Sequence, residues 1–160
     1  MDRSRREVTG SFKTVARPGD TFVAMHADAT FEVTEFTPSD YISPVTTGAP
    51  VGHAHLVKQF AGELEGRSTT QFSYAYDAAT EVGTYVAMEA FEGSLGGRAG
   101  AFAFAHSATT DGRSAERLSE LFVIAPGSGS GDLAGITGTG AMRIDADGTH
   151  RVLLDYDLPG

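Results

Sequence analysis

Apolar and polar residues alternate with a period of two along most of the chain. Between residues 68 and 76, for example, Phe72 and Tyr74 share one face while smaller or polar residues occupy the other. This period is typical of half-buried β-strands, because successive side chains of a strand point to opposite sides of the sheet. The same pattern predicts further strands over residues 21–26, 29–36, 53–61, 83–95, 101–106, 141–145 and 150–158.

Glycine- and proline-rich segments separate these runs. The pairs at 96–97 (Gly-Gly) and 147–148 (Asp-Gly) predict tight hairpin turns. Residues 37–52, with three prolines, and the glycine-rich residues 126–140 predict long loops. Loops as long as the first, when they have no regular structure, tend to be either functional lids or disordered. Residues 114–125 are ambiguous, since their apolar spacing suits a helix as well as a buried strand.

A succession of strands joined by hairpins has two compact solutions, a sandwich or a closed barrel. A barrel leaves no edge strands exposed. We therefore predict an all-β fold, a closed antiparallel barrel formed by residues 20–160, with a flexible N-terminal arm over residues 1–19. Several strands carry apolar residues on both faces, which favours packing of the barrel against another copy in a homo-oligomer.

Composition narrows the classes of partner. The formal net charge is −9, and five of the twelve basic residues lie before position 18. Nucleic acid affinity depends on Lys and Arg contacts with phosphates, so the acidic remainder argues against DNA or RNA as a partner. No apolar run is long enough for a membrane helix, and the chain contains no cysteine. A cytoplasmic protein without a membrane partner is the expectation.

Glu89 and His106 lie on strand faces that otherwise carry apolar or aromatic side chains. If these faces point into a barrel, both residues are catalytic candidates, because burial tunes the pKa of a carboxyl and of an imidazole for proton transfer. Each also has a structural interpretation. Glu89 would then pair with a buried cation or with backbone amides, and His106 would be a hydrogen-bonded core residue. The pattern alone leaves both interpretations open.

Aromatic residues in the same phase would form the wall of a binding chamber, since they offer stacking surface to an apolar ligand. The candidates for ligand contact are Phe72, Tyr74, Tyr85, Phe91, Phe102, Phe104 and, at the barrel rim, His55. The aromatic residues would serve equally well as ordinary core.

Two further patterns argue against cofactors. His53 and His55 are spaced so that a strand aims both the same way, but no third metal ligand follows them. The glycine- and serine-rich residues 127–131 lack the Lys-Ser/Thr ending of a phosphate-binding loop. Neither a metal nor a cofactor is predicted.

Several phrases, in the same order along the chain, resemble the bacterial domain of unknown function 3224 family. They are residues 60–66 (FAGELEG), 83–89 (GTYVAME), 93–102 (GSLGGRAGAF), 126–135 (PGSGSGDLAG) and 154–157 (LDYD), together with His106. The resemblance spans roughly residues 29–158. It implies an eight-stranded antiparallel barrel similar to allene oxide cyclase, whose wider group includes cofactor-free enzymes that close a polyene or epoxide into a ring.

These observations lead to one hypothesis and two alternatives. The leading hypothesis is a barrel whose lumen binds a small, mainly apolar molecule and promotes its cyclisation or isomerisation without a cofactor. Glu89 and His106 would move protons, and residues 37–52 would form a lid. The alternatives are a non-catalytic carrier or sensor, and a structural or interaction domain with a filled interior. The three hypotheses predict different interior volumes, and they differ in whether Glu89 lines the interior.

Overall fold

The computed structural model describes residues 22–160, which form antiparallel β-structure without helices. The nine strands are β1 (Phe22–Pro38), β2 (Val51–Gly62), β3 (Leu64–Asp77), β4 (Val82–Leu95), β5 (Arg98–Asp111), β6 (Leu118–Ile124), β7 (Ser130–Gly131), β8 (Thr137–Ile144) and β9 (His150–Pro159). The predicted arm, residues 1–19, lies outside the described residues. Within the described part there is no helix that could cross a membrane.

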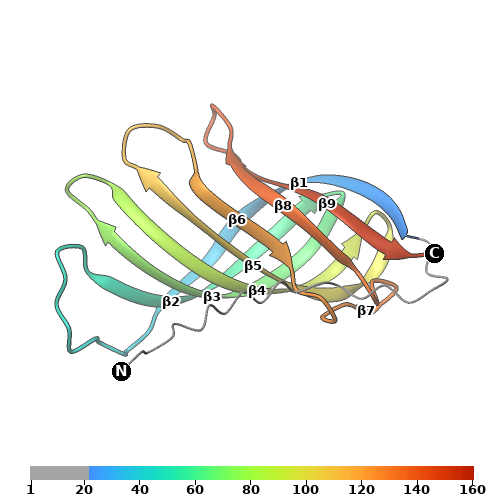
Figure 1. Ribbon diagram of the computed structural model, residues 1–160, viewed down its shortest axis with the longest axis horizontal. Helices are drawn as coiled ribbons and strands as arrows, with labels where there is room; N and C mark the ends of the chain where they lie inside the picture. Colours follow the sequence, from blue (N-terminus) through green and yellow to red (C-terminus); the bar gives the residue numbers. More distant parts are fainter. Residues whose placement is uncertain (1–21) are drawn as a thin grey trace, which may run out of the picture.

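The strands pair side by side in a closed ring, which Figure 1 shows from the side. The ring runs β1-β2-β3-β4-β5-β6-β8-β9 and returns to β1, while the two-residue β7 pairs only with β5. Every pairing is antiparallel, as expected for neighbouring strands joined by short turns. The closed all-β fold predicted from the alternation is confirmed.

β1 is one continuous strand, so the expected break between residues 26 and 29 is wrong. Its first part pairs with β9 and its second part with β2, and the two ladders overlap over residues 29–31. Asp28, which lies between the two predicted ranges, forms hydrogen bonds within the continuous strand. Its N–H donates to the Glu63 carboxylate at 2.8 Å, and its own carboxylate accepts from Arg151 at 2.6 Å.

Within the ambiguous segment at 114–125, residues 118–124 form strand β6, which pairs with β5. Its pairing with β8 on the other side covers only two residue pairs, so the junction between β6 and β8, which we call the seam, is the shortest strand pairing of the ring. Further along the seam, the Glu120 carboxylate accepts a hydrogen bond from the Met142 N–H at 3.4 Å. Pairing inside the ring thus overrides the helical spacing of the segment.

Side chains fill one half of the ring interior. Phe60, Phe91 and Phe104 are almost completely buried there, together with aliphatic residues from β6 and β9. Gly66 of β3 and Gly93 of β4 are directly paired, which lets these two strands approach closely at this end. A Cβ atom on Gly93 would lie 2.1 Å from the carbonyl oxygen of Glu65, so no other residue fits. This half of the interior is therefore a packed apolar core.

A second apolar face lies on the outside of the ring. Val86 and Met88 on β4 and Leu121 on β6 are all more than half exposed, and they are joined through their pairing to small residues of β5. This is the double-faced pattern from which we predicted a homo-oligomer, and that prediction stays open.

Phe104→Ala should lower the free energy of unfolding by about 3–5 kcal/mol, because it leaves a cavity in the packed half of the ring. Val86→Ala, at a position 58% exposed on the outer face, should change it by less than about 1 kcal/mol. Denaturant unfolding of both variants measures the difference. Equal, small effects would contradict a filled interior at this end.

Candidate functional site

Glu89 lies at the centre of a buried group of polar side chains. The carboxylate is 0% exposed, and strands on both sides supply its partners. Lys58 Nζ of β2 donates to it at 2.6 Å and Ser68 Oγ of β3 at 2.5 Å. The Nε2 atom of His106, on β5, lies 3.0 Å away. Ser68 and His106 are diagonal neighbours of Glu89 across the sheet, within reach of side-chain contact.

The hydrogen bonds continue from His106 to the end of the ring. Its Nδ1 atom lies 2.8 Å from the hydroxyl of Tyr85. The guanidinium of Arg117 donates to the same hydroxyl oxygen, and its Nε donates to Glu120 at 2.5 Å. We call this chain the interior polar network. It consists of Lys58, Ser68, Glu89, His106, Tyr85, Arg117 and Glu120.

The charges of the buried residues follow from burial and hydrogen bonding. Burial favours a raised pKa for Glu89, but the hydrogen bonds from His106, Lys58 and Ser68 outweigh it and hold the pKa below its usual value. Burial lowers the pKa of Lys58, although the Glu89 carboxylate opposes this. Burial also lowers the pKa of His106, so the imidazole is neutral at pH 7.

These charges determine the direction of the hydrogen bonds. An ionised carboxylate only accepts, so the proton of the neutral His106 ring is on Nε2 and is donated to Glu89. Nδ1 is then an acceptor, and the Tyr85 hydroxyl donates to it. Burial raises the pKa of Tyr85 even though Arg117 opposes the shift, and the phenol therefore keeps its proton.

A strained backbone position brings Arg117 and Glu120 together. Ser119 lies between them with φ of 51°, in the left-handed region that residues with a side chain rarely adopt. The β5–β6 register shifts at this point, which marks a bulge. Such strain typically costs about 1–3 kcal/mol and is concentrated at functional sites. Because a bulge changes the direction of side chains, it allows both residues to reach the interior.

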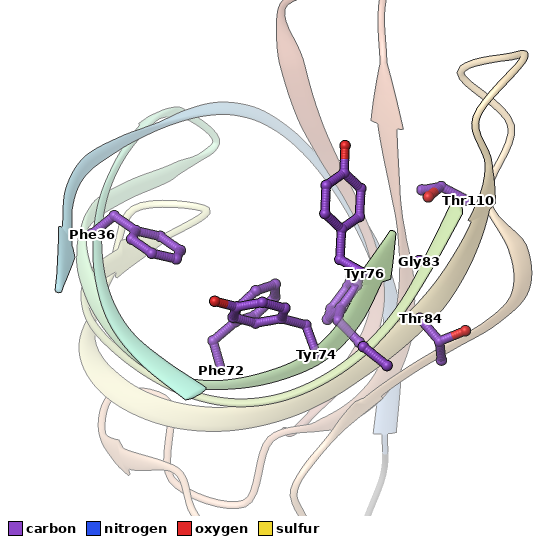
Figure 2. A pocket seen from close by; sticks show the side chains of 9 residues that line it. Phe36, Phe72, Tyr74, Tyr76, Gly83, Thr84 and Thr110 are labelled. Atoms are coloured by element: carbon purple, nitrogen blue, oxygen red, sulfur yellow. The ribbon is translucent and has the colours of Figure 1, made fainter. Parts of the chain in front are cut away.

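An apolar pocket of about 400 Å³ lies at the open end of the ring, near the β3–β4 turn. In Figure 2, Phe36 of β1 lies across the mouth from Phe72 and Tyr74 of β3. Tyr76, Tyr85 and Thr110 are further lining residues.

The floor of the pocket depends on close aromatic packing. The rings of Phe72 and Tyr85 lie 5.1 Å apart. Tyr74 packs directly over Gly52, where an added Cβ would lie 2.4 Å from the Tyr74 ring. Only glycine at position 52 lets Tyr74 adopt this place in the wall.

The residues expected to line one chamber fall into three groups. Phe72, Tyr74 and Tyr85 line the pocket. Glu89 and His106 lie deeper, in the interior polar network, and do not line it. Phe91, Phe102 and Phe104 belong to the packed core, with exposed fractions of 1–2%.

His55 lies outside the ring, and its expected place at the ligand is wrong. In β2 the residues with even numbers point inward, as Ala54, Leu56 and Lys58 show by their burial. His55 therefore faces solvent. His53 points to the same side but is half-buried, and its Nδ1 lies 2.9 Å from the Ser73 hydroxyl. Among the described residues, no three His, Asp or Glu side chains come together as a metal site.

Sequence reasoning missed four members of the network, Lys58, Ser68, Arg117 and Glu120. Lys58 had a signal, because it is in phase with the apolar Leu56 and Phe60 on one strand. A cation on a buried face implies a buried anion nearby. Arg117 had no comparable signal, since it lies within the ambiguous segment 114–125 and its contacts depend on the bulge at Ser119.

The fold and site define a class of protein: a closed antiparallel ring with a charged network inside and an apolar pocket at one mouth. The chain belongs to the family described as "Protein of unknown function (DUF3224)", which matches residues 27–156. This confirms the resemblance noted in the sequence.

One solved structure supports the same assignment. It is the crystal structure of a DUF3224 family protein with unknown function from Shewanella oneidensis MR-1, to which this chain is 31% identical. The TM-score is 0.71, and the match covers 84% of this chain and 97% of that chain. No curated protein matches the chain. The likeness to allene oxide cyclase is tested by neither finding and stays a prediction.

The free energy of unfolding should fall as the pH drops from about 7 to about 4. The folded-state pKa of His106 is lowered, so the unfolded chain takes up this proton first, below its usual pKa of about 6.5. Glu89 adds a second loss below about pH 4.3, as the pH falls towards its lowered folded-state pKa. Chemical denaturation at pH 7.5 and 5.5 measures the first loss. In His106→Gln the free energy of unfolding should change less between these two pH values than in the wild type. His55→Gln is the control and should keep the wild-type change. The same change in both variants would refute a buried neutral imidazole at position 106.

Lys58→Met should destabilise the protein by about 3–5 kcal/mol, because it leaves the Glu89 carboxylate buried without its cation. The double variant Lys58→Met/Glu89→Leu should be more stable than Lys58→Met alone, since it removes both charges. Denaturant unfolding of the two variants measures this difference. A double variant that is less stable than the single one would show that the pair is not the dominant buried interaction.

Proposed function

We propose that the protein binds a small, mainly apolar molecule at the mouth of the ring. The observation that carries this proposal is the apolar pocket of about 400 Å³. Its volume falls in the range of about 300–1,000 Å³ that is usual for small-molecule sites. A few polar groups among aromatic walls are also typical of such sites.

The position of the pocket limits the ligand. Aromatic side chains occupy the far half of the ring, so the ligand lies at the mouth and not in the middle of the lumen. Its apolar body would pack on Phe36, Phe72 and Tyr74, and a hydrogen-bonding oxygen would lie near the hydroxyls of Tyr85 or Thr110. This favours an apolar molecule with one polar end over a sugar or a nucleotide.

The loop between β1 and β2 supports the proposal as a lid. It joins the strand of Phe36 to Gly52, which lies under Tyr74 in the pocket wall. Ile42 is 86% exposed and Val45 is 68% exposed in this loop. Closure over a ligand would bury these apolar side chains and exclude water from the pocket.

A second candidate function, cofactor-free isomerisation or cyclisation, has one observation in its favour. Tyr85 belongs both to the pocket and to the interior polar network. Holding a flexible apolar molecule in a reactive shape beside a proton-transfer group is sufficient for such chemistry. A carrier or sensor would use the same pocket without turnover, so measured turnover separates the two candidates.

Binding of the neutral fluorescent probe N-phenyl-1-naphthylamine tests the pocket. Phe36→Ala together with Tyr76→Ala should weaken binding about 30-fold, since each partly exposed ring contributes about 1 kcal/mol of contact. Fluorescence titration gives the two dissociation constants. Met88→Ala, an exposed apolar position on the outer face, serves as the control and should leave the affinity unchanged. A control that weakens binding equally would place the probe outside the pocket.

A further inference from the structure

Tyr85 is the one described residue shared by the pocket and the interior polar network. Its ring lies 5.1 Å from that of Phe72 in the pocket wall and 5.3 Å from that of His106 behind it. The guanidinium of Arg117 lies over the same ring, 5.3 Å from its centroid. Any exchange between a bound molecule and the buried charges therefore passes through this side chain.

The hydrogen bonds of the Tyr85 oxygen leave one position free. A phenol donates one hydrogen and has two acceptor positions. The hydrogen is donated to His106 Nδ1, and Arg117 occupies one acceptor position. The second acceptor position has no partner among the described residues. The oxygen can accept a proton there while its own proton moves to His106.

The surrounding charges suit such a transfer. His106 becomes an imidazolium when it takes the proton, and Glu89, 3.0 Å from its Nε2, stabilises that cation. Arg117, hydrogen-bonded to the phenolic oxygen, offsets negative charge that develops beside it. Lys58 keeps Glu89 ionised throughout. The arrangement follows the logic of an acid–histidine–hydroxyl triad, with a tyrosine hydroxyl at the substrate end.

Satisfying the buried charges does not require this outer part of the network. Glu89 already accepts from Lys58, Ser68 and His106. Arg117 is 15% exposed at its side chain and pairs with Glu120 in any case. The strained Ser119 is what brings this pair to Tyr85. This backbone strain lies at the end of the interior polar network that is nearest to the pocket, which points to a functional role.

We propose that Tyr85 is a catalytic residue that carries protons between a bound apolar ketone and His106, and so isomerises the ketone. The inference rests on the proposed function, because the ketone must occupy the pocket. A proton leaves the carbon next to the carbonyl for the Tyr85 oxygen as the tyrosine proton moves to His106 Nδ1. The electron pair of the C–H bond stays on the substrate as an enolate. Reversal of both transfers returns a proton to the same carbon or to a conjugated one, so the step needs no oxidant, reductant or cofactor.

Deuterium exchange into 2-tetralone tests this proton relay, in which Tyr85 takes a proton from the ketone and passes its own to His106. This compact aromatic ketone has an acidic C–H beside its carbonyl, and mass spectrometry reports deuterium uptake in D₂O. The wild-type protein should accelerate uptake over buffer, and Tyr85→Phe should lose about 100-fold or more, as expected for removal of general acid–base catalysis. Tyr156→Phe, which removes a hydroxyl from the packed core, should leave the rate unchanged.

The role of His106 is read from the pH profile. The wild-type rate should fall as the pH drops and the imidazole becomes protonated, because a protonated ring cannot take the tyrosine proton. His106→Gln should be slow and should lack this dependence. A His106→Gln variant that keeps the wild-type rate and pH profile would remove the histidine from the relay.

Binding and catalysis are separable in these measurements. Tyr85→Phe keeps the ring, so its affinity for N-phenyl-1-naphthylamine should stay within about twofold of wild type, since only one hydroxyl is lost. Wild-type protein that binds this probe but exchanges 2-tetralone no faster than Tyr85→Phe would overturn the relay and leave the binding proposal standing. Failure to bind the probe at all would overturn the proposed function itself.

Discussion

The burial of the Glu89 carboxylate is the constraint on which the rest of this structure depends. An isolated charge in a closed ring would cost several kcal/mol, so neighbouring strands must supply its partners. β2 supplies Lys58, β3 supplies Ser68 and β5 supplies His106. A slip of one residue in any of these strands would turn its partner to the outside of the ring. The three contacts with Glu89 thereby favour one register of the four strands β2 to β5.

The same network divides the interior into two parts with different roles. Beyond Glu89, aromatic and aliphatic side chains such as Phe91 and Phe104 are buried in the packed core and hold the ring together. Towards the β3–β4 turn the interior opens into the apolar pocket of Figure 2. Tyr85 lies at the boundary, with its ring against Phe72 and its hydroxyl in the network. The position of the interior polar network thus limits how deeply a ligand can enter the ring.

The geometry of the shortest seam connects fold and chemistry. β6 pairs with β8 over only two residue pairs, and the bulge at Ser119 lies in the part of β6 that β8 does not pair with. Glu120 accepts from Met142 across this gap, while Arg117 reaches Tyr85 from the loop before β6. Both side chains therefore come from the part of the chain where β6 and β8 are not paired, and the Arg117 cation lies beside Tyr85 in the pocket wall.

The sequence by itself determined most of the strands and the residues that share a face, because a period of two records directly which side of a sheet each residue occupies. It favoured a closed ring over a sandwich, but it divided β1 in two and left residues 114–125 ambiguous. It also placed Glu89 and His106 on inner faces among aromatic residues. Only the tertiary structure decided that Lys58 pairs with Glu89, that Arg117 reaches Tyr85, and that the pocket lies at the mouth while Phe102 and Phe104 fill the core. Contacts across the ring depend on its radius and on the stagger of its strands. These quantities arise from the pairing of the whole sheet and leave no trace in the alternation along any one strand.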